Sequence, residues 1–205
     1  MTEGIQSAAA AGSEIELIPE DYFAPLDLAR IFPNPGPLEV DLGCGDGGFI
    51  AAQAERFPER NFLGIEKLGG RVQRASKKAA RSGLRNVRVI RVESAYAVQY
   101  LLPPGSVDTV HLLFPDPWPK KKHRRRRIVT PEFLASLYRL LAPDGRFRIA
   151  TDQENYFASI RELIPASGFM EVPPPEGETF PITTFEKHFV REGASIYRLA
   201  LRKLS

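Results

Sequence analysis

The stretch "PLEVDLGCGDGGFIAAQAERFP", residues 37–58, decides the fold that this chain is expected to adopt. Residues 37–43 form a short apolar run that ends in a glycine, as a buried strand does, and residues 48–58 have helical spacing of apolar side chains that stops at Pro58. Glycines are needed between two such elements where the backbone takes a positive φ or approaches a ligand closely. The stretch therefore predicts a strand, a glycine-rich turn and a helix.

The same alternation of strands and helices continues along the chain. Further strands are expected at 61–66, 86–92, 106–114, 146–152 and 195–203, and helices at 69–82, at 130–145 and from the end of 146–152 to about Ser167. The helix at 130–145 has Thr130 as its N-cap, Pro131 at its first position and Gly145 as its stop. Alternation at this spacing predicts an α/β fold with a doubly wound, mostly parallel sheet and helices on both faces.

The composition predicts one domain. A chain of 205 residues with 43% apolar and 26% charged residues is long enough for one sizeable core and short for two. We expect a flexible acidic tail at 1–16 and a single domain at 17–205. The N-terminal stretch lacks the pattern of a secretory signal, and the apolar runs are too short to span a membrane, so no membrane contact is expected. One cysteine, Cys44, suits a reducing cytoplasm.

The positive charge is concentrated in one segment. The basic run, Lys120–Arg127, holds seven of the 28 Lys and Arg residues, and the remaining 21 are outnumbered by 25 acidic residues. A basic patch on an otherwise acidic protein indicates a localised contact with a polyanion. A solvated charge run is the alternative interpretation.

Four carboxylates fall at or just after the ends of predicted strands. They are Asp41, Glu66, Asp116 and Asp152. In doubly wound sheets the carboxyl ends of the strands form the edge at which ligands bind. The sequence therefore predicts a ligand site at this edge, lined by acids that packing does not explain.

The glycine turn, residues 43–48, fits two ligand patterns. Three of its glycines match the G-x-G-x-x-G pattern of dinucleotide sites, which alone is weak. Together with Asp41, the glycines at 43, 45 and 47 match the pattern of S-adenosylmethionine-dependent methyltransferases. A carboxylate there suits an amino group and a positive sulfonium and suits a pyrophosphate badly, and Glu66, about 20 residues on, can accept hydrogen bonds from ribose hydroxyls. A plain tight turn is the third interpretation.

Three more stretches follow in order: "FPDPWPKKKHRRRRI" (114–128), "ATDQENY" (150–156) and "TTFEKHFVREGASIYRL" (183–199). With the glycine turn, they resemble the bacterial tRNA (guanine-N7-)-methyltransferase family over about residues 35–203. The resemblance implies a Rossmann-like class I methyltransferase fold with a seven-stranded sheet. It also implies transfer of a methyl group from S-adenosylmethionine to N7 of the guanine at position 46, in the variable loop of tRNA, with tRNA bound by the basic run.

The resemblance further implies roles for individual residues. Cofactor contact falls on Asp41, Gly43, Gly45, Glu66, Ser94 and Asp116. Asp116 is the implied catalytic residue, and substrate contact falls on Lys120, Asp152, Thr183, Thr184, Phe185 and Glu186. The family often has Glu at the position of Asp41, and Asp or Asn at that of Ser94, so Glu93 or the backbone is an alternative contact for the adenine.

The chemistry of guanine N7 suits these residues. N7 carries an available lone pair, so no proton has to be removed and no strong general base is needed. The enzyme must align N7 with the methyl carbon and sulfur, and a fixed carboxylate can stabilise the charge that develops on the purine. Asp116, held between Pro115 and Pro117, is the candidate for this task. The three histidines are scattered, so no metal site is expected.

Several alternatives remain open at this point. The chain could be a methyltransferase for another RNA or a small molecule, a non-catalytic RNA-binding module on the same fold, or a nicotinamide-dependent oxidoreductase. Trp118 could stack on an extruded base or pack against the fold. The sequence leaves open whether the protein is a monomer or a homodimer.

Overall fold

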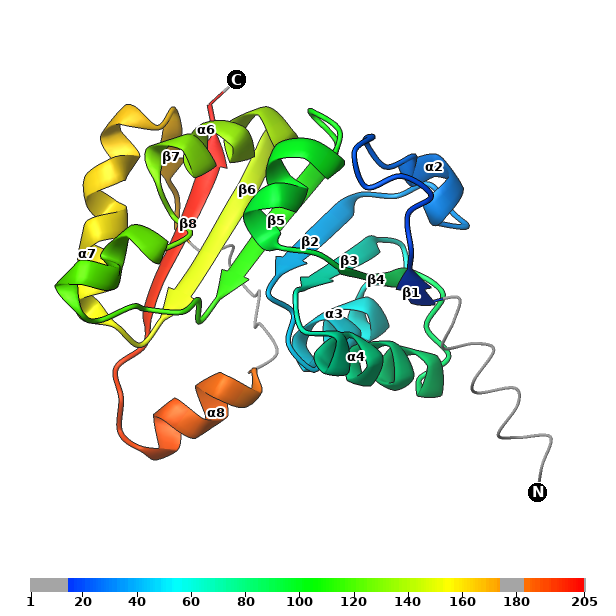
Figure 1. Cartoon of the computed structure of the whole chain (residues 1–205), viewed down its shortest axis with the longest axis horizontal. Helices are drawn as coiled ribbons and strands as arrows, with labels where there is room; N and C mark the ends of the chain where they lie inside the picture. Colours follow the sequence, from blue (N-terminus) through cyan, green and yellow to red (C-terminus); the bar gives the residue numbers. More distant parts are fainter. Residues whose placement is uncertain (1–14, 174–182, 205) are drawn as a thin grey trace.

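A computed structural model describes residues 15–173 and 183–204, apart from the side chains of Thr184 and Phe185. Its centre is an eight-stranded sheet with the order β1-β4-β3-β2-β5-β6-β8-β7 (Figure 1). The strands are β1 (Glu16–Leu17), β2 (Leu38–Leu42), β3 (Asn61–Glu66), β4 (Val87–Arg91), β5 (Val107–Leu113), β6 (Leu141–Thr151), β7 (Phe169–Glu171) and β8 (Tyr197–Lys203). Only the pairings of β8 with β6 and β7 are antiparallel. The predicted α/β fold with a mostly parallel sheet is confirmed.

Helices cover both faces of this sheet. They are α2 (Leu28–Ile31), α3 (Gly48–Arg56), α4 (Gly69–Arg81), α5 (Ser94–Tyr96), the π-helix η1 (Ala97–Leu101), the 3₁₀ helix η2 (Lys121–Arg126), α6 (Pro131–Leu140), α7 (Glu154–Leu163), η3 (Ile164–Ala166) and α8 (Thr184–Arg191). Strand residues alternate between the two faces, so Phe62 packs into the core layer under α3 and α4, while Leu63 and Ile65 join the larger layer that contains η1, α6 and α7.

The structure differs from the expected elements in several places. The sheet has eight strands rather than seven, and its two shortest strands, β1 beside β4 and β7 beside β8, were not placed from the sequence because two or three residues give no periodic signal. The helix expected at 130–145 ends at Leu140, because Pro143 disfavours a helical conformation at the residue before it. Of the predicted tail at 1–16, residues 1–14 lie outside the described residues, whereas Ile15 is buried in the core and Glu16 begins β1.

The parallel strands end at a common edge, and this edge positions the site. In Figure 1 the arrowheads of β2, β5 and β6 point toward the side of the molecule where α8 lies. The Phe114 ring, directly after β5, lies 5.4 Å from the Phe189 ring of α8 between centroids. Helix α8, which precedes β8, therefore lies at the edge where the predicted carboxylates are found. Among the described helices, none is both long and apolar enough to cross a membrane.

Candidate functional site

The glycine turn adopts the backbone that its sequence predicts. Gly43, Gly45 and Gly47 all have positive φ, at 78°, 59° and 75°. A Cβ at Gly47 would lie 2.7 Å from the Cβ of Ala75, so the close approach of α4 also requires a glycine there. A Cβ at Gly43 would meet nothing within 4 Å. The turn therefore packs tightly on its α4 side and is open where Gly43 faces the edge of the sheet.

Two buried carboxylates flank this turn. Glu66 accepts hydrogen bonds from the backbone N–H of Gly45 at 3.2 Å and of Leu68 at 2.9 Å, and Arg71 Nη1 lies 3.7 Å from it. Burial, with the nearby charge of Glu66, raises the pKa of Asp41 to about 7. A cation bound beside Asp41 would favour its ionised form. The pair therefore suits a ligand with a positive group at one end and hydroxyl donors at the other, as S-adenosylmethionine has.

A cavity of about 560 Å³, the main cavity, opens at the carboxyl edge of the sheet. The ends of β2, β3, β5 and β6 contribute to its lining. It brings together five residues that the sequence predicted for one site: Gly43, Glu66, Ser94, Asp116 and Asp152. A smaller hollow of about 150 Å³ contains Asp41 and Thr183 and shares Gly43, Arg71 and Leu113 with the main cavity. The predicted strand-end acids thus line two adjacent spaces.

The Asp116 loop, residues 114–118, forms one wall of the main cavity. Its two end residues, Phe114 and Trp118, have positive φ values of 54° and 43°, which bulky side chains rarely adopt. The Phe114 N–H donates to Ala150 O at 2.8 Å, which ties the start of the loop to β6. The Asp116 side chain is 69% exposed, and its Oδ2 lies 3.7 Å from Lys67 Nζ. The candidate catalytic carboxylate is therefore accessible within a strained, tethered loop.

The residues around Ser94 belong to the lining of the main cavity. Ser94 begins α5, and both Ser94 and Glu93 line the main cavity. The Glu93 carboxylate accepts a hydrogen bond from Tyr96 N at 2.9 Å and so caps this helix. Glu93 remains exposed, so the choice between Glu93 and Ser94 as a cofactor contact stays a prediction.

The predicted substrate residues near α8 are only partly placed. Thr183 caps α8 by accepting from Glu186 N at 3.0 Å, and the Glu186 carboxylate pairs with Arg198 of β8. The side chains of Thr184 and Phe185 lie outside the described residues. Lys120 is exposed and, within the part of the chain described, belongs to the lining of neither hollow. A substrate contact by Glu186 would have to compete with Arg198.

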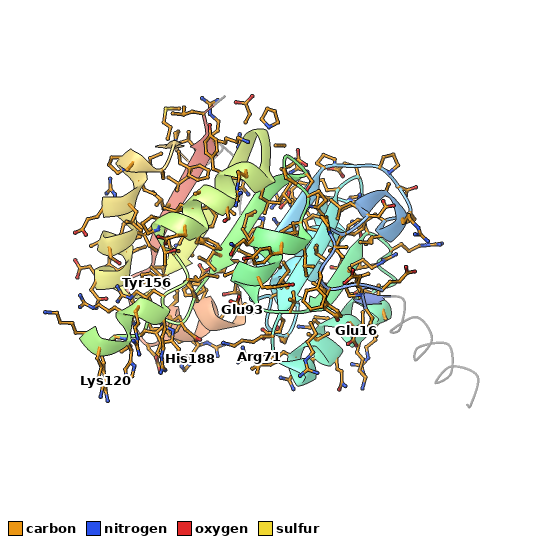
Figure 2. All side chains as sticks on the ribbon, turned by 45° about the horizontal axis from the view of Figure 1, so that its top comes forward. Glu16, Arg71, Glu93, Lys120, Tyr156 and His188 are labelled. Atoms are coloured by element: carbon orange, nitrogen blue, oxygen red, sulfur yellow. The ribbon has the colours of Figure 1, made fainter. Side chains whose placement is uncertain are left out.

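The basic run does not act as one uniform surface. Its residues Lys120–Lys122 and Arg124–Arg126 are exposed, while Arg127 is only 6% exposed and turns inward. Arg127 thus differs from the exposed residues of the run, because its guanidinium is bound inside the protein. The outer residues share an edge with other basic side chains: Figure 2 shows Lys120, His188 and Arg71, from three different segments, along one side of the molecule.

Three residues at this site were not singled out by the sequence interpretation. Lys67 contacts Asp116, although its position directly after Glu66 was a usable signal. Arg127 has no local signal, because its partners lie about 30 residues away on α7. Arg71 of α4 lines both hollows and lies beside Glu66, which becomes apparent only when β3 and α4 are packed together. No group of three or more His, Cys, Asp or Glu side chains within the described residues could hold a metal ion.

Comparison with known proteins gives matches over nearly the whole described fold. Residues 35–199 match the model of a family described as "Putative methyltransferase". A tRNA (guanine-N(7)-)-methyltransferase of Geobacter metallireducens is 35% identical over 193 residues, covering 91% of this chain and 92% of the relative. A protein of the same name from Leifsonia xyli subsp. xyli is 40% identical over 187 residues, covering 87% and 82%.

Solved structures support the fold. A structure described as an antibiotic-related methyltransferase has a TM-score of 0.65 and 19% identity, covering 91% of this chain and 96% of the other. The 16S rRNA methyltransferase KamB also has a TM-score of 0.65 and 19% identity, covering 88% and 95%. At this level of identity the likeness is one of architecture, and it agrees with the Rossmann-like class I fold expected from the sequence.

Proposed function

Since the chain belongs to the tRNA (guanine-N(7)-)-methyltransferase family, we propose that it methylates N7 of the guanine at position 46, in the variable loop of tRNA, with S-adenosylmethionine as methyl donor. The observation that supports this most strongly is the shared cavity. Gly43 and Glu66, the candidate cofactor contacts, and Asp116, the candidate catalytic residue, line the same space at the edge of the sheet. A methyl donor and a guanine must meet in one such space.

The cofactor end of the site rests on three features. Glu66 is oriented by two backbone N–H groups and can accept hydrogen bonds from ribose hydroxyls. Asp41 lies at the opposite side of the glycine turn, where a cationic amino group would neutralise it. Gly43 leaves open space between them. When bound, S-adenosylmethionine supplies an electrophilic methyl group on a positively charged sulfur.

The substrate end needs orientation and charge stabilisation rather than a base. The N7 lone pair forms the new bond to the methyl carbon, and the electron pair of the broken bond stays on sulfur, so no proton has to leave first. Positive charge moves onto the purine, and the Asp116 carboxylate stabilises it. Asp116 can also accept from the N1–H and N2–H groups of a guanine that has left its stack. Rigid attachment of the loop keeps this carboxylate in place.

The tRNA backbone is held by the exposed part of the basic run and by neighbouring cations on the same edge. Phosphate contacts supply affinity and orientation that depend little on sequence. We also propose a cytoplasmic location, where tRNA is available and the buried thiol of Cys44 stays reduced.

The test is incubation of the protein with S-adenosylmethionine labelled in the methyl group, in parallel with bulk tRNA and with ribosomal RNA. Digestion to nucleosides and chromatography then identify the labelled base. We expect label in 7-methylguanosine from tRNA alone. Label in another nucleoside, or equal label in ribosomal RNA, would replace this function by methylation of a different RNA site.

A further inference from the structure

Arg127, the last residue of the basic run, donates its hydrogen bonds to other residues of the protein. Arg127 donates from Nε to Pro117 O at 2.9 Å, from Nη1 to Ser159 Oγ at 3.0 Å and from Nη2 to Asn155 Oδ1 at 2.6 Å. Its guanidinium carbon lies 4.4 Å from the centre of the Tyr156 ring, which is itself 1% exposed. One buried guanidinium therefore joins the Asp116 loop to three residues of α7.

The loop that Arg127 holds is one that needs an anchor. A non-glycine residue held at positive φ costs about 1–3 kcal/mol, and such residues persist only when surrounding contacts impose them. Phe114 and Trp118 both have this conformation and bracket Asp116. The start of the loop is tied to β6 through Phe114 N, and its end is tied to α7 through the carbonyl of Pro117. Asp116 lies between these two ties.

The acceptors of Arg127 also separate it from the rest of the run. All three are neutral oxygens, and burial of a cation against neutral partners is costly unless its hydrogen bonds are well made. Arg124, Arg125 and Arg126 stay exposed. A guanidinium is the side chain that can reach a loop carbonyl and two acceptors on one helix at once, because its donors form a rigid planar fork.

We propose that Arg127 is a positioning residue for the methyl transfer: it fixes the Asp116 loop on α7 and so holds the Asp116 carboxylate toward the guanine, while its neighbours bind phosphate. This inference rests on the proposed function. It assigns two tasks to one run of sequence, RNA backbone contact by Arg124–Arg126 and loop anchoring by Arg127.

The chain contains a built-in probe for this role, because its single tryptophan, Trp118, ends the loop. The test variant is Arg127→Lys, which keeps the charge but cannot serve all three acceptors, and the matched control is Arg85→Lys at an exposed position before β4. We expect acrylamide quenching of Trp118 fluorescence to rise about twofold in Arg127→Lys alone, because the loop opens locally. We expect kcat on tRNA to fall at least about tenfold, because the carboxylate is misplaced, while tRNA affinity and its salt dependence stay near wild type.

Other results overturn the proposal. Unchanged quenching, together with weaker tRNA binding and a flatter salt dependence like that of Arg124→Gln, would make Arg127 a phosphate contact. Increased quenching with unchanged kcat would show that the anchoring serves stability alone. If circular dichroism shows that Arg127→Lys does not fold, the double variant Asn155→Ala and Ser159→Ala, which removes acceptors and leaves Arg127, decides by the same two readouts. If the wild-type protein does not methylate tRNA, the proposed function fails, and the fluorescence comparison still tests the anchoring.

Discussion

Lys67 Nζ lies 3.7 Å from Asp116 Oδ2, so the residue directly after Glu66 contacts the candidate catalytic carboxylate. Lys67 follows β3 and Asp116 lies in the loop after β5, and the pair therefore joins two parts of the wall of the main cavity. Both side chains are more than half exposed, so water screens their attraction. An incoming guanine can replace Lys67 at small cost.

Replacing Asp116 is expected to slow methyl transfer far more than replacing Lys67. In Asp116→Asn, kcat on tRNA should fall about 100-fold or more, because a neutral amide no longer stabilises the charge that develops on the purine. Single-turnover methylation of tRNA, with the fold checked by circular dichroism, measures this effect.

The matched control for this experiment is Lys67→Met, which removes the ion pair and keeps the carboxylate. It should change kcat by less than about fivefold, as a screened surface pair contributes little. A near-normal rate for Asp116→Asn, or an equal loss in both variants, would contradict a direct role of Asp116 in catalysis.

The raised pKa of Asp41 has a consequence for stability. Because this pKa is about 7 in the fold and lower in the unfolded chain, the folded state holds the proton more tightly, and stability falls as pH rises from about 4 to about 7. Asp41→Asn removes this cost, so it should raise the free energy of unfolding at pH 8 by about 2–4 kcal/mol and have little effect at pH 4.

Urea unfolding of both proteins at the two pH values measures this difference. Although Asp41→Asn should be more stable, it should bind S-adenosylmethionine more weakly, because the charge that attracts the amino group of the ligand is lost. Calorimetry measures this affinity. A variant that is no more stable at pH 8 than wild type would show that Asp41 is not held in its destabilised, charged form.

The exposed part of the basic run should control tRNA affinity. Changing Arg124, Arg125 and Arg126 to Gln should reduce the slope of log affinity against log salt by about 2–3, because each lost phosphate contact releases about one counterion fewer. Filter binding at a series of salt concentrations measures the slope. Arg30→Gln with Arg85→Gln, which changes exposed arginines away from the site, is the control. An unchanged slope in the triple variant would remove these residues from the interface.

The close contact at Gly47 gives a prediction about stability alone. Gly47→Ala places a Cβ 2.7 Å from that of Ala75 and also strains a positive φ, so it should cost more than about 2 kcal/mol. Gly83→Ala has a similar φ of 67° but open space around its Cβ, and should cost only about 1 kcal/mol. Equal losses in urea unfolding would show that the contact with α4 adds nothing.

The contrast between Gly47 and Arg127 shows how far the sequence alone can predict this site. The glycine turn, the strand-end carboxylates and the positions of the longer strands follow from local patterns, because a strand, its turn and its helix are contiguous in the chain. The inward orientation of Arg127 depends on Asn155 and Ser159, which are distant in the sequence. Because the seven residues before it are all Lys, Arg or His, the sequence suggested that Arg127 was one more exposed charge. The ion pair of Glu66 with Arg71 was likewise invisible until β3 and α4 were placed together.

Identifying the nucleotide that the protein methylates is the most direct test of the proposed function. Two transcripts of one tRNA, one with guanine and one with adenine at position 46, are incubated with the protein and S-adenosylmethionine, then reduced and treated with aniline, which cleaves the chain at 7-methylguanine. We expect cleavage at position 46 of the first transcript and none in the second. Cleavage at another guanine, cleavage of both transcripts, or incorporation of methyl groups without cleavage would contradict the proposed function.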